Sequence, residues 1–275
     1  MKCGSTTLYH DLLSHPDIFL PDKESNLLFS SSPKDAFSEA YKKSKASQIC
    51  GEVCPDYSKL PDFSDVIPIT KSLFTDSPPR IIYLVRDPLS RTLSHHRFVS
   101  SRRDTRFPTM APDINQCLSD HPELIDYSCY AMQIRPWIDA FGKDSVLIIR
   151  FEDFIQNRIG TLKQISAFLG VSHDHVTTEQ GLVHNRSDSR PVLTPTWQRF
   201  IGTKFYLRVL RPLLSLTLRD KIRALVLPRP SNDWTPPTLE TKQHIIDLLR
   251  DDVIELQKIL ELDSPPWVLD KTESQ

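Results

Sequence analysis

The first residues of the chain have the composition of an anion-binding loop. The string KCGSTT (2–7) holds a lysine, a glycine and three hydroxyl side chains, and an apolar pattern typical of a helix follows at Leu8, Leu12 and Leu13. Backbone N–H groups of such a loop can surround a phosphate, and the helix N-terminus favours its negative charge. The loop lacks the G-x-x-x-x-G-K-[ST] spacing that holds a nucleoside triphosphate, so a shorter anion is expected.

A second candidate anion site lies in RDPLSRTLS (86–94), directly after the apolar run IIYLV. Arg86 would then stand at the carboxyl end of a buried strand, where open α/β sheets bind ligands. Ser94 follows Asp87 by two helical turns and shares its helix face. A guanidinium can grip a phosphate with two N–H groups, and a serine hydroxyl can donate to the same phosphate. The alternative is local: Arg86 pairs with Asp87, and Ser94 is solvated.

Together the two strings resemble the nucleotide-binding motifs of sulfotransferases that use 3'-phosphoadenosine-5'-phosphosulfate (PAPS). Their order along the chain, with a strand before the second motif, matches that family. The resemblance implies that the first motif binds the 5'-phosphosulfate and the second the 3'-phosphate, without a metal ion. The residues implied are Lys2, Cys3, Gly4, Ser5, Thr6 and Thr7 at the 5' end, and Arg86 and Ser94 at the 3' end.

More of the chain resembles the same family, and most closely its heparan-type and bacterial carbohydrate sulfotransferases. The matching segments are LLSHPDIFLPDKESNLLF (12–29), GEVCPDYSKLP (51–61), 146–171 and 239–267. The resemblance implies sulfuryl transfer from PAPS to a hydroxyl acceptor, which we expect to be a glycan or glycolipid. The products are a sulfate ester and 3',5'-bisphosphoadenosine. HNRSDSR (184–190) resembles the loop that closes over the nucleotide, which implies a nucleotide contact from Arg186 or Arg190.

Sulfuryl transfer requires a base for the acceptor hydroxyl and positive charge beside the leaving phosphate. Lys2 is the candidate cation. The resemblance implies Glu24 as the base, since glycan-type members carry a glutamate in the matching KE element, and partial desolvation makes a carboxylate a better base. Several of those members have a further lysine where this chain has Val53. Any contribution of that lysine at the acceptor or the sulfuryl group is therefore absent here or comes from Lys71. Glu52 contacts acceptor hydroxyls or caps locally. The rival bases are His10, His15, His95, His96 and His184.

Short apolar runs alternate with helical patterns along the chain. Strands are predicted at 48–53, 80–85 and 144–151, and helices at 87–102, 128–142, 158–170 and 239–260. Within 158–170 the predicted apolar face comprises Ile159, Leu162, Ile165 and Leu169. This alternation predicts a three-layer α/β/α sandwich with a mainly parallel sheet. The family resemblance implies that the sandwich is of the P-loop type. We expect one domain over 1–275, with a helical C-terminal part from about residue 195.

A strand before the anion loop is missing from this sequence, because only Met1 precedes Lys2. In the family that strand is central to the sheet. We therefore expect Met1 to be an internal methionine of a longer chain. Two other functions stay open: an N-terminally truncated nucleotide-binding pseudoenzyme, and a P-loop nucleotide kinase, which the short loop disfavours.

Charge and cysteine content narrow the partners. The net charge of -1 gives no basic field for nucleic acid. Residues 199–229 hold eight basic residues and one acid, which suits a membrane surface or an anionic glycan, or else helices that solvate their arginines. The five cysteines fit no zinc or disulfide spacing, which favours a reducing compartment. We expect a cytoplasmic protein, with a Golgi-type anchor as the alternative.

Overall fold

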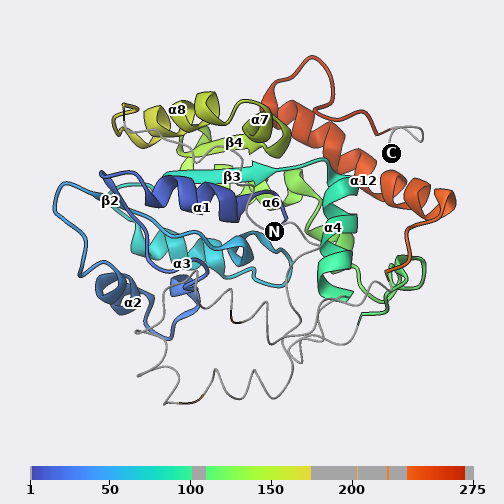
Figure 1. Ribbon diagram of the computed structural model, residues 1–275, viewed down its shortest axis with the longest axis horizontal. Coiled ribbons are helices and arrows are strands. Elements are labelled where there is room, and N and C mark those ends of the chain that lie inside the picture. The colour runs from blue at the N-terminus through green and yellow to red at the C-terminus, as the bar shows by residue number, and fades with distance from the viewer. Residues whose placement is uncertain (1, 101–109, 175–202, 204–221, 223–233, 270–275) are drawn as a thin grey trace.

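The computed structural model describes residues 2–100, 110–174, 203, 222 and 234–269 of the 275-residue chain (Figure 1). Its N-terminal half contains α1 (Ser5–Leu13), β1 (Ile18–Phe19), η1 (Leu27–Phe29), α2 (Pro33–Ala40), β2 (Ile49–Cys50), η2 (Pro55–Ser58), α3 (Val66–Leu73), β3 (Ile81–Val85) and α4 (Pro88–Ser100). The later elements are η3 (Ile114–Gln116), α5 (Glu123–Asp126), α6 (Tyr130–Phe141), η4 (Lys143–Ser145), β4 (Val146–Arg150), α7 (Phe151–Gln156), α8 (Arg158–Leu169) and α12 (Leu239–Leu260).

The strands pair in parallel, as the sequence predicts. β3 runs beside β4, from Ile81 opposite Val146 to Val85 opposite Arg150. The predicted strand at 48–53 is shorter, since β2 covers only Ile49–Cys50 and pairs with β1, which the sequence pattern did not predict. In the described part of the chain these strands form two separate two-stranded sheets. The strand expected before Lys2 stays a prediction, because Met1 lies outside the described residues.

Side chains of the β3–β4 ladder alternate between two cores, which makes the central layer of a three-layer arrangement. Tyr83, Val85 and Val146 pack with residues of α6 and α12 in one buried cluster. Ile82 and Ile149 pack on the opposite face of the ladder, in a second buried cluster that includes residues of α1, α7 and α8. Figure 1 shows this ladder with α8 on one side and α3 on the other. The α/β fold class predicted from the sequence is therefore confirmed.

Local capping residues set the ends of the predicted helices. The backbone N–H of Ser90 donates to Asp87 Oδ1 at 2.7 Å, so Asp87 caps α4 and Pro88 takes its first position. α8 ends at Gly170, which adopts the left-handed conformation at φ 74°. The predicted apolar face of α8 is correct at Leu162 and Ile165 but wrong at Ile159, which is 50% exposed.

The C-terminal helix α12 belongs to the same core as the sheet. Its Leu256 joins the cluster of Val85 and Tyr130, and its Ile245 and Leu249 pack with Leu89 of α4. The single domain over 1–275 stays a prediction, and most of the expected helical part from about 195 lies outside the described residues. None of the helices in the described ranges combines the length and apolar character needed to cross a bilayer.

Candidate active site

The loop 2–7 has the backbone geometry of an anion cradle. Gly4 precedes α1 in the left-handed conformation at φ 87°, and no side chain caps the helix. The first N–H groups of α1 therefore keep their capacity to bind an anion, and its first turn carries no acidic residue. Thr7 is 1% exposed, and its Oγ1 has no hydrogen-bond partner among the described residues. A phosphate or sulfate oxygen fits that unsatisfied hydroxyl, because such an oxygen accepts hydrogen bonds.

Arg86 lies against this loop rather than against its own neighbour. It follows β3, and its Nη1 donates to the backbone carbonyl of Lys2 at 3.3 Å. Its guanidinium carbon lies 5.1 Å from the ring centroid of Phe151. Asp87, the local partner considered from the sequence, caps α4 with its carboxylate instead. The structure thus brings together two motifs that are far apart in the sequence.

Lys2 reaches from the loop to helix α4, which carries Ser94. The Lys2 Nζ lies 4.6 Å from the centroid of the Phe98 ring. Phe98 follows Ser94 by one helical turn, and residues four apart share a helix face. The lysine, the arginine and the serine-bearing helix therefore converge. Arg190, Arg186 and the loop that contains them lie outside the described residues.

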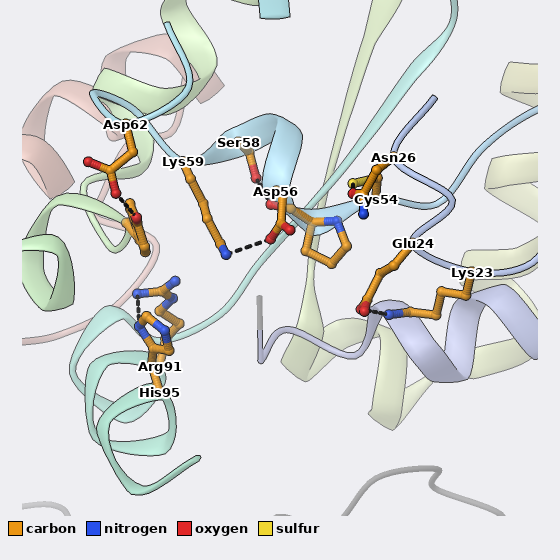
Figure 2. Close-up of polar contacts among 12 residues, drawn as sticks. Lys23, Glu24, Asn26, Cys54, Asp56, Ser58, Lys59, Asp62, Arg91 and His95 are labelled. Atoms are coloured by element: carbon orange, nitrogen blue, oxygen red, sulfur yellow. Dashed lines mark hydrogen bonds and ion pairs between the residues drawn. The ribbon is translucent and has the colours of Figure 1, made fainter. Parts of the chain in front are cut away.

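Next to the loop, two buried cations, Lys59 and Arg91, form a cationic cluster beside His95. The sequence analysis considered His95 only as a rival base and did not predict the two cations. The exposed fractions of Lys59, Arg91 and His95 are 5%, 1% and 4%. Lys59 pairs with Asp56 at 2.5 Å (Figure 2). Arg91 donates from Nη1 to Ser128 Oγ at 3.1 Å. The only signal in the sequence was a lysine in the GEVCPDYSK segment and an arginine inside the second motif.

His95 is held neutral by this cluster. Burial is the main cause of a pKa well below the usual histidine range, and the charges of Arg91, Lys59 and Lys2 lower it further. His95 Nδ1 lies 3.4 Å from Arg91 Nη1. Because an arginine can only donate, Nδ1 accepts this bond and the proton of the neutral ring sits on Nε2. The free lone pair that a general base needs is therefore engaged.

Two other histidines from the list of rival bases have structural partners at both ring nitrogens. His15 donates from Nε2 to the Ser172 carbonyl at 2.7 Å, and its Nδ1 accepts from the Asp17 backbone N–H. His96 donates from Nε2 to the Ala111 carbonyl, and its Nδ1 accepts from Trp234 Nε1 at 2.9 Å. His10 packs edge-on against the Tyr9 ring. His184 lies outside the described residues.

Glu24, the base implied by the resemblance, lies between β1 and η1. Its backbone has φ 63°, and its N–H donates to the Val53 carbonyl at 2.9 Å. The carboxylate is 53% exposed and pairs with the Lys23 ammonium (Figure 2). Desolvation of this carboxylate is therefore only partial, and the paired ammonium of Lys23 stabilises its charged form.

Two residues weighed for the acceptor side have other surroundings. Glu52 accepts from the Tyr57 hydroxyl at 2.6 Å and from the Leu27 N–H at 3.1 Å, so it caps η1 from another segment of the chain. Burial raises the pKa of Glu52. Lys71 is exposed on α3, and the buried lysine near the loop is Lys59 instead. Within the described ranges, no three His, Cys, Asp or Glu residues are arranged to hold a metal ion.

Comparison with known proteins gives one family. Residues 1–187 match the family model of the sulfotransferase domain. Sulfotransferase 2A6 from Rattus norvegicus is 28% identical over 102 residues, which cover 37% of this chain and 34% of that protein. The 3-alpha-hydroxysteroid sulfotransferase from Cavia porcellus is 28% identical over 101 residues, which cover 36% and 34%. The similarity therefore extends over about a third of these relatives' length.

A solved structure gives the same fold over a larger part of the chain. A sulfotransferase from Alicyclobacillus acidocaldarius superposes with a TM-score of 0.61 at 18% identity. The superposition covers 96% of this chain and 93% of that one. At this identity the likeness concerns the fold alone, a three-layer α/β arrangement.

Proposed function

The chain belongs to the PAPS-dependent sulfotransferase family, and from this premise we propose that it transfers a sulfuryl group from PAPS to a hydroxyl acceptor. The observation that carries the proposal is the contact of Arg86 with the loop 2–7. An arginine beside a helix N-terminus suits a nucleotide with phosphate groups at both its 5' and 3' positions.

The residues present fit PAPS as the donor. When bound, it supplies the sulfuryl group and a bisphosphorylated leaving group. The uncapped N-terminus of α1, the Thr7 hydroxyl and Lys2 would hold the 5' end, and Arg86 and Ser94 the 3' end. Lys2 would neutralise the charge that grows on the leaving phosphate. The buried cations Lys59 and Arg91 add a positive field that needs no reorganisation, because both are already held by neighbours.

Glu24 is the proposed general base. Its carboxylate would take the proton of the acceptor hydroxyl, while the acceptor oxygen forms a bond to sulfur and the sulfur–oxygen bond to the phosphate breaks. Half exposure leaves the carboxylate accessible to an acceptor from solvent. The engaged ring nitrogens of His15 and His96 and the Nδ1 bond of His95 support Glu24 over these rivals.

For the acceptor we keep a carbohydrate as the proposal, on the resemblance to glycan-type members. Phe29 and Phe63 support a cyclic acceptor, because their rings lie 4.9 Å apart and are 39% and 37% exposed. Phe29 also packs on Tyr57, whose segment runs beside that of Glu24. A steroid alcohol is the second candidate, supported by the similarity to a hydroxysteroid sulfotransferase. An aromatic surface can contact the apolar face of either ring system.

The location and partners are also proposals. None of the five cysteines, all of which lie in described segments, forms a disulfide, which supports the cytoplasmic location. Peripheral membrane contact through 199–229 stays a proposal, because that stretch lies almost entirely outside the described residues. A nucleic-acid partner is not proposed.

Incubation with sulfate donor labelled in the sulfuryl group and a panel of glycans, steroids and phenols tests this function. We expect label in one acceptor class, and much less label with the Arg86→Ala variant at the same, sub-saturating donor concentration. Binding of bisphosphoadenosine without transfer to any acceptor would favour the pseudoenzyme. Transfer of the γ-phosphate from ATP that is labelled in that phosphate, with no sulfuryl transfer, would favour the kinase.

A further inference from the structure

Tyr130 contacts both nucleotide motifs with a single hydroxyl. The backbone N–H of Arg86 donates to Tyr130 Oη at 3.1 Å, and Cys3 Sγ lies 3.5 Å from the same oxygen. The side chain is 1% exposed, so no solvent competes for these bonds. A displacement of either motif would leave a buried polar group without its partner, which costs more than an exposed bond.

Phe151 contacts the same two motifs with its ring. The Arg86 guanidinium lies over the ring face, with 5.1 Å from its central carbon to the centroid. A Cβ atom at Gly4 would lie 2.8 Å from two carbons of the same ring. Only a residue without a side chain allows this approach, so the ring sets how closely Gly4 and Arg86 come together.

The sheet positions Phe151, and helix α6 positions Tyr130, where the two motifs meet. Phe151 follows β4 directly, and the last residue of β4 is paired with Val85, the last residue of β3. Glu152, next to Phe151, accepts from the Asp87 N–H at 2.9 Å. The turn after β3 is therefore fixed from the neighbouring strand. Tyr130 is fixed from α6, whose Ile134 and Trp137 belong to the core.

We infer that Tyr130 and Phe151 are positioning residues, which join the 5' loop to the 3'-phosphate arginine so that the two ends of the donor nucleotide bind as one unit. The inference rests on the proposed function. Neither side chain needs to contact the nucleotide. Each acts through Arg86, Cys3 or Gly4, and the consequence is a high preference for a nucleotide with both phosphates over one with the 5'-phosphate alone.

Calorimetry with 3',5'-bisphosphoadenosine and adenosine 5'-monophosphate measures this preference as a ratio of two dissociation constants. In Tyr130→Phe we expect the ratio to fall about tenfold, the size of one buried hydrogen bond. The matched control is Tyr9→Phe, which loses a hydroxyl bond to the Pro21 carbonyl in another part of the core. Its ratio should equal that of the wild type. A purely structural role for Tyr130 would weaken both ligands equally and leave the ratio unchanged, which would overturn the inference.

Two substitutions at Phe151 test the ring. Phe151→Leu should lower the affinity for bisphosphoadenosine by about tenfold, and Phe151→Tyr, which keeps the ring, should restore most of it. Thermal unfolding of each variant shows that it is folded. Equal affinities in Phe151→Leu and the wild type would also overturn the inference. If the wild type binds neither ligand, the proposed function fails, and the inference falls with its premise.

Discussion

Arg86 donates a hydrogen bond from Nη1 to the backbone carbonyl of Lys2 at 3.3 Å. The contact joins the turn after β3 to the loop before α1, and it orients the guanidinium beside an uncapped helix N-terminus. Anions bind at such termini because the N–H groups and the helix dipole point at them. The predictions below start from this relationship and move outward from the loop.

Arg86→Ala should weaken the binding of bisphosphoadenosine by about 1.5–3 kcal/mol, the usual loss for a hydrogen bond to a charged group. Ser94→Ala should cost less, because a hydroxyl carries no charge. The control is Arg80→Ala at the opposite end of β3, where the side chain bonds to the Phe168 carbonyl. Calorimetry that finds equal affinities for Arg86→Ala and Arg80→Ala would remove the 3'-phosphate assignment.

Gly4→Ala should destabilise the protein more than Gly170→Ala does. Both glycines lie in the left-handed helical region, Gly4 at φ 87° and ψ 9° and Gly170 at φ 74° and ψ 29°, so the backbone strain of an alanine is similar. Only Gly4 also meets a neighbour, since its Cβ would lie 2.8 Å from the Phe151 ring. We expect a further loss of about 1–3 kcal/mol in the free energy of unfolding, typical of overpacking. Denaturant titration of the two variants gives this difference.

Glu24→Gln should lower turnover by roughly 10²–10⁴-fold while the affinity for the donor nucleotide stays near that of the wild type. The substitution keeps the shape of the side chain and removes the base. Glu39→Gln is the matched control, because Glu39 also pairs with a nearby lysine, Lys42, on an exposed surface. If turnover survives in Glu24→Gln but collapses in a histidine variant, the glycan-type assignment of the base is wrong.

Acid should destabilise the protein through His95. The pKa of His95 in the folded state lies well below its usual value. As pH falls below about 6.5, the unfolded chain binds a proton that the folded state refuses, so stability is lost from that pH downward. His95→Gln should flatten this dependence by up to about 1.4 kcal/mol per pH unit. Denaturant titrations at pH values from about 4.5 to about 7.5, the range in which a histidine changes its charge, measure the free energy of unfolding. The slope of that free energy against pH is then compared between His95→Gln and the wild type.

The same histidine reports the field of the cationic cluster. Lys59 is one of the charges that lower the pKa of His95, after burial and Arg91. Lys59→Met should therefore raise that pKa, whereas Lys71→Met, on the exposed side of α3, should leave it unchanged. An NMR titration of the imidazole resonances measures both. Equal values in the two variants would show that Lys59 contributes no field at the site.

Several features were predictable from the sequence because they depend on neighbours along the chain. The apolar run 81–85 forms a strand, Asp87 and Pro88 start α4, and Gly170 ends α8. In each case the cause is a hydrogen bond or a backbone preference that acts within a few residues.

The tertiary structure decided the contacts between residues that are distant in sequence. The sequence alone determined an α/β chain with two anion motifs, but it left several histidines equal as bases. The folded chain engages His15 with Ser172 and His96 with Trp234, and it buries Lys59 and Arg91 near His95. It also places Phe151 between Gly4 and Arg86. The physical reason is that burial and partner choice depend on which surfaces meet, and no pattern local to one segment carries that information.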